Sequence, residues 1–245
     1  MTPYQLLGIV AVIAVVRVAL TVRPVAVASN GRTLSVAREY LDPFIFAGVA
    51  AWFLITFIAR TYYIPSESMV PTLKVSDVLL VDKIAYRVHK PSEGDVVVFV
   101  PPIPSPDDFI KRVIGTPGDN VRIRGGTVYV NGIALTEPYI AQKPFYDLEI
   151  RNYGIYVNDG AWHALDPGVA NIPPKSQWTA PDRIPPHCYL MLGDNRNNSD
   201  DSHLWGFAQD TGTFATGPRA GEHASFTGHA FVVFWPFTQA RILHV

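Results

Sequence analysis

The sequence of 245 residues contains little cysteine and little charge. Cys188 is its only cysteine, so a single chain can form neither an internal disulfide nor a structural zinc site made of cysteines alone. Charged side chains make up 17% of the residues, against about a quarter in a typical soluble domain. The formal net charge is -1, which provides no positive field to attract nucleic acid. We therefore expect no nucleic-acid partner and a chain that is partly shielded from water.

Several catalytic and metal-binding patterns are also missing. No serine lies in a Gly-x-Ser-x-Gly elbow, so the α/β-hydrolase arrangement has no support. The loop that contains Asp194, Asp200 and Asp201 lacks the glycine and the terminal glutamate of an EF-hand calcium loop. We expect neither a metal nor a cofactor.

Apolar residues are concentrated near the N-terminus. Leu6–Val22 and Phe44–Ala59 are apolar apart from two residues in the first stretch and one in the second, and each is close to the length needed to cross a bilayer. We predict two transmembrane helices, at about residues 5–22 and 43–60, so that residues 1–60 form a membrane anchor.

The basic residues between these stretches predict the topology. Arg23, Arg32 and Arg38 favour a cytosolic loop, which places both termini outside. Arg17 weakens the first span, although its side chain can reach toward the cytosolic face. The alternative is a cleavable signal peptide ending at Ala26-Val27-Ala28, but such peptides carry basic residues before the apolar core, and none precedes Arg17.

After Arg60 the pattern changes to short runs of β-branched residues bounded by turn residues, which are typical of strands. These runs are Val78–Val81, Val96–Val100, Ile110–Ile114, Val121–Arg124, Thr127–Val130, Tyr189–Leu192 and Phe231–Trp235. The fold class expected for residues 61–245 is therefore mainly β, with antiparallel sheets.

Turn residues and loop composition refine this picture. Gly125-Gly126 fits a two-residue hairpin loop, and Pro117-Gly118 fits a type II turn. Residues from about 139 to 186 are rich in proline, glycine, asparagine and aromatic residues. We expect an insertion there with short strands, because so long a structureless loop is unusual in a compact domain.

Two serines follow the second apolar stretch directly. Ser66 and Ser68 lie between Pro65 and Pro71, which restrict the backbone and suit a rigid loop that fixes two hydroxyl groups. A juxtamembrane linker rich in proline and serine would have the same composition, so this segment alone does not establish a site.

A lysine on a predicted strand is the second candidate. Side chains two positions apart share one face of a strand, so Lys111 is expected beside Phe109 and Val113. Burial disfavours an ammonium group, and a buried lysine can act as a general base near neutral pH. The alternative is that Lys111 and Arg112 are charges that protect an exposed sheet edge.

The third candidate is the stretch 193–206, in which asparagine, aspartate and serine follow an apolar strand and favour a loop with many internal hydrogen bonds. Taken in order, the three segments resemble the type I signal peptidase family, the bacterial leader peptidases. Pro-Ser-x-Ser-Met-x-Pro-Thr-Leu at 65–73 is similar to the nucleophile box of that family, and Ile-Lys-Arg at 110–112 to its lysine box. Gly-Asp-Asn-Arg at 193–196, with the serine and aspartate residues after it, is similar to its C-terminal box.

The resemblance implies a serine-lysine dyad protease on a largely β fold. Ser68 would be the nucleophile and Lys111 the general base, and the Ser66 hydroxyl with the Ser68 N–H would form the oxyanion hole. Ser199 would orient the lysine and Asp201 would support the site. Two residues differ from the family pattern: Asn197 stands where aspartate is frequent, and His203 where arginine is frequent.

The same resemblance implies a function. We expect a membrane-bound endopeptidase that removes signal peptides from exported preproteins after small residues at -1 and -3. Its partners would be signal peptides and the lipid bilayer, near the secretion translocon, with the catalytic domain of residues 61–245 on the extracytoplasmic side of a bacterial cytoplasmic membrane.

Three alternatives remain. The chain could be a catalytically silent relative that acts as a membrane-tethered binding or assembly module, although such a module needs neither Ser68 nor Lys111. A self-cleaving repressor-type Ser-Lys protease is less consistent with the two apolar stretches and with the lack of a DNA-binding segment. His203 is the one rival base among the 7 histidines.

Overall fold

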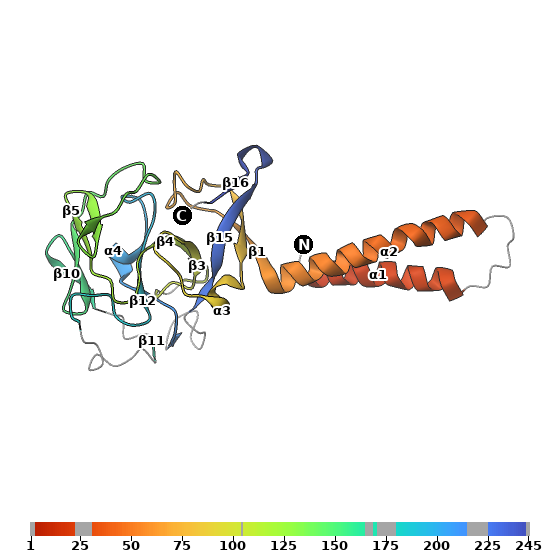
Figure 1. The fold of residues 1–245 in the computed structure, drawn as a ribbon, viewed down its shortest axis with the longest axis horizontal. Helices are drawn as coiled ribbons and strands as arrows, with labels where there is room; N and C mark the ends of the chain where they lie inside the picture. Colours follow the sequence, from red (N-terminus) through yellow and green to blue (C-terminus); the bar gives the residue numbers. More distant parts are fainter. Residues whose placement is uncertain are drawn as a thin grey trace. The chain divides into compact units, whose positions relative to one another are not determined.

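The computed structural model describes residues 3–22, 31–103, 105–164, 169–170, 180–214 and 225–243. These residues form two compact units, Met1–Arg60 and Thr61–Val245. The first unit is helical and the second is built mainly of strands (Figure 1).

The first unit is a pair of helices that run alongside each other (Figure 1). Helix α1 spans Pro3–Val22 and helix α2 spans Gly31–Phe53, and a π-helical turn, η1 (Leu54–Ile58), continues α2. The helices approach closely where Gly48 faces Val10, since a Cβ atom on Gly48 would lie 2.5 Å from Val10 Cγ2.

One stretch of this unit is long and apolar enough to cross a membrane. It is Glu39–Ile58, with a mean hydropathy of 1.9, whereas the apolar part of α1, Tyr4–Ala19, is shorter. Arg17 of α1 forms a bidentate ion pair with Asp42 of α2, with distances of 2.7 Å from Nε to Oδ1 and 3.1 Å from Nη2 to Oδ2. Arg17 is thus neutralised within the helix pair, where the sequence had suggested that it reaches toward water.

The expected loop between the apolar stretches is shorter than predicted. Helix α2 begins at Gly31, so Arg32 and Arg38 lie in a helix, where the sequence had indicated a loop. Because no helix-breaking residue follows Gly31 before Pro43, the polar residues extend the apolar helix toward its N-terminus. Arg23 and the Ala26-Val27-Ala28 pattern lie outside the described residues.

The second unit contains three sheets, and every strand pair whose register is described is antiparallel. The largest has the order β1-β2-β15-β3-β4-β12-β13, with β16 also paired to β15. Its strands are β1 (Ala59–Tyr63), β2 (Val78–Asp82), β3 (Val96–Phe99), β4 (Phe109–Gly115), β12 (Cys188–Leu192), β13 (Ala208–Gln209), β15 (Phe226–Trp235) and β16 (Arg241–Ile242).

The second sheet has the order β10-β9-β8-β5-β6-β7, and a third consists of β11 and β14. Their strands are β5 (Val121–Arg124), β6 (Thr127–Val130), β7 (Ile133–Ala134), β8 (Leu148–Arg151), β9 (Gly154–Val157), β10 (Gly160–Ala164), β11 (Val169–Ala170) and β14 (Thr213–Phe214). Short helical turns complete the unit: α3 (Ala85–Val88), α4 (Ser202–Trp205) and η3 (Phe237–Gln239).

The mainly β, antiparallel fold expected from the sequence is confirmed. Each predicted run of β-branched residues falls on a strand, and β15 begins five residues earlier than its apolar run indicated. Gly125 and Gly126 have positive φ angles of 53° and 75°, as a two-residue hairpin loop requires, and Gly118 has a φ of 93° in its turn.

The stretch 139–186 contains short strands, as the sequence analysis expected. Strand β8 pairs with β5, and β9 and β10 extend the same sheet. Residues 165–168 and 171–179 of this stretch lie outside the described residues. That the stretch is an insertion stays a prediction, but its strands share a buried apolar cluster with β5 and β12, which includes Ile123, Leu148, Ile155 and Leu192.

Candidate active site

The loop with the two serines is held against the first sheet. Ile64 N donates to Asp77 O at 2.9 Å, and Leu73 N donates to Met69 O at 2.8 Å. Met69 and Leu73 are buried in the apolar cluster between β2, β3 and β15. Burial of these side chains within the loop fixes the backbone between them, and this leaves Ser66 exposed and Ser68 half-buried.

Strand β4 presents Lys111 to this loop. It lies inside the sheet between β3 and β12, which excludes the interpretation of Lys111 and Arg112 as edge charges. Lys111 is 4% exposed, and its Nζ is 5.4 Å from the centre of the Phe109 ring, on the face that strand alternation predicted. Its Nζ also lies 2.9 Å from Ser68 Oγ, within hydrogen-bonding distance.

The burial of Lys111 changes its acid-base behaviour. Loss of contact with water lowers the pKa of the Lys111 ammonium, while the charges of Asp201, Asp200 and Asp194 raise it in part. A lowered pKa increases the fraction of neutral amine near neutral pH, and only the neutral amine can accept a proton from Ser68. The pair therefore has the geometry and the electrostatics of a nucleophile with its base.

The neighbouring Arg112 points to the opposite face and forms a buried ion pair. Its Nε and Nη2 donate to the two carboxylate oxygens of Asp194 at 2.8 and 2.7 Å, and both side chains are fully buried. Thr72 Oγ1 also donates to Asp194, and the Tyr139 ring lies 3.9 Å from the guanidinium carbon. This ion pair links the lysine strand, the serine loop and the loop after β12.

The loop after β12 also binds the backbone at Ser68. Asn195 N donates to Ser68 O at 3.0 Å, and Asn195 Nδ2 donates to Glu67 O at 3.2 Å. A Cβ atom on Gly193 would lie 2.4 Å from Ser68 O, so glycine is required for this close approach. Asn195 was not singled out from the sequence, because its partners are backbone atoms that are distant along the chain.

The predicted supporting residues differ in what they contact. Asp201 is fully buried, and its Oδ2 accepts from Gly193 N at 2.9 Å while its Oδ1 accepts from His203 Nδ1 at 2.7 Å. Ser199 is buried, but its Oγ has no hydrogen-bond partner within the described part of the chain. Its expected role in orienting Lys111 stays a prediction. Ser66 Oγ lies 3.4 Å from Ser68 Oγ.

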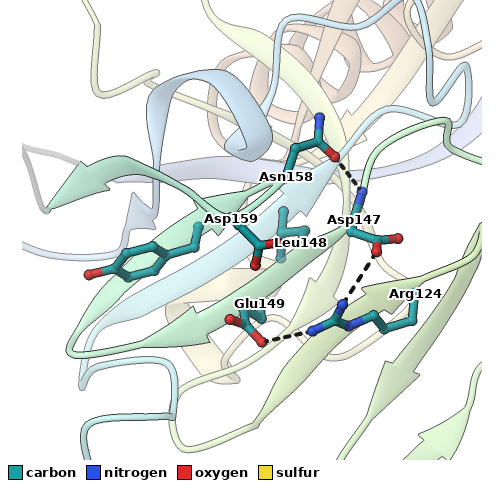
Figure 2. Close-up of a pocket in the computed structure, with 7 residues that line it drawn as sticks. Arg124, Asp147, Leu148, Glu149, Asn158 and Asp159 are labelled. Carbon is teal, nitrogen blue, oxygen red and sulfur yellow. Dashed lines mark hydrogen bonds and ion pairs between the residues drawn. The ribbon is translucent and has the colours of Figure 1, made fainter.

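A surface depression and His203 are less suited to catalysis than the Ser68–Lys111 pair. The depression at β5, β8 and β9 is lined by charges that pair with one another, since Arg124 reaches both Asp147 and Glu149 at 3.5 Å (Figure 2). His203, the rival base, forms a hydrogen bond with Asp201, whereas Lys111 forms one with Ser68. No group of three or more metal-binding side chains occurs among the described residues.

Comparison with known proteins gives one consistent family. The family model described as signal peptidase, peptidase S26, matches residues 37–217. The chain is 41% identical to probable signal peptidase I-2 of Synechocystis sp. over 193 residues, which is 77% of this chain and 68% of that protein.

Two other relatives carry similar names. Signal peptidase I of Leptolyngbya laminosa is 40% identical over 188 residues, which is 74% of this chain and 71% of that protein. Signal peptidase IB of Staphylococcus aureus is 34% identical over 203 residues, which is 83% of this chain and 92% of that protein.

The burial of Lys111 predicts a pH-dependent cost in stability. An unfolded lysine has a pKa of about 10.4, and the folded value is lower, so folding releases a proton at any pH between these two pKa values. The free energy of unfolding should therefore rise with pH toward about 10. Lys111→Met removes this dependence. We expect its melting temperature, relative to wild type, to be highest at low pH and to lose that advantage as the pH rises.

The measurement is thermal unfolding of the detergent-solubilised chain across the pH range. The control is Lys90→Met, at an exposed lysine, for which the difference from wild type should not vary with pH. A difference for Lys111→Met that is also constant with pH would mean that the folded lysine is charged.

Proposed function

The chain belongs to the signal peptidase family, peptidase S26, and on that premise we propose that it is a membrane-bound endopeptidase that removes N-terminal signal peptides from exported preproteins. It would cleave after small residues at -1 and -3. The observation that supports this best is the 2.9 Å approach of Lys111 Nζ to Ser68 Oγ, with the lysine buried.

The proposed reaction begins with Ser68. Its Oγ attacks the carbonyl carbon of the scissile bond while Lys111 accepts the hydroxyl proton. The Ser66 hydroxyl and the Ser68 N–H stabilise the negative oxygen of the tetrahedral intermediate. The protonated Lys111 then donates its proton to the leaving amine, which yields an acyl-enzyme. Lys111 next activates a water molecule, and hydrolysis releases the signal peptide and regenerates Ser68.

The loop contacts support this assignment of roles. The bonds from Asn195 to the backbone at Glu67 and Ser68 restrict the motion of the nucleophile. Such restriction favours catalysis because a reacting group held in place loses less entropy in the transition state. A catalytically silent relative remains the alternative, but it would gain nothing from a buried lysine that touches the serine.

We also propose that residues 1–60 are the membrane anchor, with helix α1 crossing the membrane as well as the stretch Glu39–Ile58. The Arg17–Asp42 pair supports two crossings, because an arginine paired with a carboxylate costs less in an apolar environment than one left alone. The β unit would then lie on the extracytoplasmic side of a bacterial cytoplasmic membrane, near the translocon. Signal peptides, which are also embedded in the bilayer, would reach it there.

Cleavage of a preprotein with an Ala-x-Ala site tests the dyad. Ser68→Ala removes the attacking oxygen, and Lys111→Arg keeps a charge that guanidinium does not release, so both variants should be inactive. Ser92→Ala and Lys90→Ala change exposed residues outside the site and should cleave at the wild-type rate. Activity near wild type in either dyad variant would refute the assignment.

Ser66→Ala tests the oxyanion hole separately. Loss of one donor to the oxyanion should lower kcat by about 10²- to 10³-fold while the variant remains folded. Single-turnover kinetics with the same preprotein would measure the effect. An unchanged kcat would remove Ser66 from the site.

Reporter fusions test the topology. A reporter inserted near residue 30 should be cytosolic, and one fused after Val245 should lie on the opposite side of the membrane. The N-terminal sequence of the purified protein provides the control. An external reporter near residue 30, or a mature protein that begins at Ser29, would contradict the two-span anchor.

A further inference from the structure

The two residues that differ from the family pattern, Asn197 and His203, contact the same short segment. This is the 143–146 segment, which consists of Lys143, Pro144, Phe145 and Tyr146 and precedes strand β8. Asn197 forms hydrogen bonds with Lys143 and Phe145, and the His203 ring stacks on the Tyr146 ring. These contacts join the 139–186 stretch to the loop that carries Asp201.

The contacts of Asn197 require an amide side chain. Asn197 Nδ2 donates to Lys143 O at 3.0 Å, and Asn197 Oδ1 accepts from Phe145 N at 2.9 Å. An ionised aspartate could accept from Phe145 N but could not donate to Lys143 O. Asn197, which departs from the family pattern, can therefore form hydrogen bonds with both Lys143 O and Phe145 N, whereas an aspartate could form only one of them.

The contacts of His203 require an imidazole ring. Its ring stacks on Tyr146 with a centroid distance of 4.4 Å and an angle of 11° between the planes. Its Nδ1 lies 2.7 Å from Asp201 Oδ1. Because an ionised carboxylate only accepts hydrogen bonds, Nδ1 must carry the hydrogen. His203 thus transmits the position of Tyr146 to Asp201.

Asp201 in turn acts on the proposed base. It is fully buried, its other oxygen accepts from Gly193 N at 2.9 Å, and Gly193 lies against Ser68 O. Among the carboxylates that raise the pKa of Lys111, Asp201 has the largest effect, followed by Asp200 and Asp194. Burial and, next in size, the charge of Asp201 raise the pKa of the Tyr146 hydroxyl.

The 143–146 segment is also held from its other side. A Cβ atom on Gly126 would lie 2.9 Å from Lys143 Cβ and 3.3 Å from Pro144 O, so the β5–β6 turn packs directly against it. Pro144 and Tyr146 are buried, whereas Phe145 is 85% exposed. The segment is therefore docked between the β5–β6 turn and the loop after β12.

We propose that the 143–146 segment is a strap that positions Asp201 and, through the bond to Gly193 N, the backbone at Ser68, the partner of Lys111. Asn197, His203 and Tyr146 are then positioning residues for the cleavage reaction, and this inference rests on the function proposed above. With the strap in place, the Asp201 carboxylate is shared between His203 and Gly193 N. Without the His203 bond its charge is less compensated, and Lys111 should hold its proton up to a higher pH.

Two substitutions at His203 separate its ring from its hydrogen bond. His203→Phe keeps an aromatic ring for Tyr146 but loses the donor, whereas His203→Asn keeps a donor near the position of Nδ1. We expect His203→Phe to lower kcat by about tenfold to a hundredfold at neutral pH with little change in KM, because the base is misplaced by a fraction of an ångström. Its pH profile of kcat/KM should shift to higher pH. His203→Asn should restore the pH profile, because a donor to Asp201 is kept, but only part of kcat, because its side chain cannot stack on Tyr146.

A matched control and a second site complete the test. His89→Phe makes the same change at an exposed histidine and should leave the profile unchanged. Asn197→Asp, which loses the donor to Lys143 O, should shift the profile in the same direction as His203→Phe. Equal losses in His203→Phe and His203→Asn without a shift of the profile would show a merely structural role and overturn the proposal, as would a His203→Phe variant with wild-type kcat and profile.

The failure of the strap can be distinguished from failure of the proposed function. If wild type does not cleave the preprotein, or Ser68→Ala still does, the function is wrong. In that case the titration of the Lys111 amine by NMR still tests the strap. A midpoint that is higher in His203→Phe than in wild type supports the strap, and an identical midpoint refutes it.

Discussion

The site depends on one constraint, which is that two adjacent basic residues are buried on opposite faces of the central strand β4. Arg112 satisfies this constraint through its bidentate pair with Asp194, and Lys111 satisfies it through a lowered pKa and a contact with Ser68. A buried charge is costly unless it is paired or neutralised, and the two residues avoid this cost in different ways. Because side chains alternate along the strand, Arg112 stabilises the structure on one face while Lys111 can accept a proton on the other.

The same constraint explains how distant segments converge. Asp194 binds Arg112 and accepts a hydrogen bond from Thr72, so the loop after β12 joins the lysine strand to the serine loop. Gly193 and Asn195 then fix the backbone at Ser68. Removing one partner of such a buried pair leaves an uncompensated charge, which costs more than the pair contributes. The buried pair therefore acts mainly to specify how strand β4, the serine loop and the loop after β12 are arranged.

Local sequence patterns predicted part of this structure. The β-branched runs indicated the strands, Gly125-Gly126 indicated the hairpin turn, and alternation placed Lys111 beside Phe109. The order of the strands in the sheets and the backbone contacts of Asn195 depend on residues that are distant in the chain, and no local pattern records them. For the same reason the partner of Arg17 was missed, as was the lack of a partner for Ser199 Oγ within the described residues. The start of α2 at Gly31 was missed because the polar residues before Pro43 had suggested a loop.

The central claim is that Lys111 is a neutral amine beside Ser68 at working pH. The most direct measurement is a titration of lysine side chains by NMR in the full chain, with Lys111 assigned by its absence in Lys111→Met. The account predicts a midpoint for Lys111 below the value of about 10.4 that is characteristic of a lysine in water. A Lys111 that titrates together with the exposed lysines would contradict the account, because a charged amine could not accept the proton of Ser68.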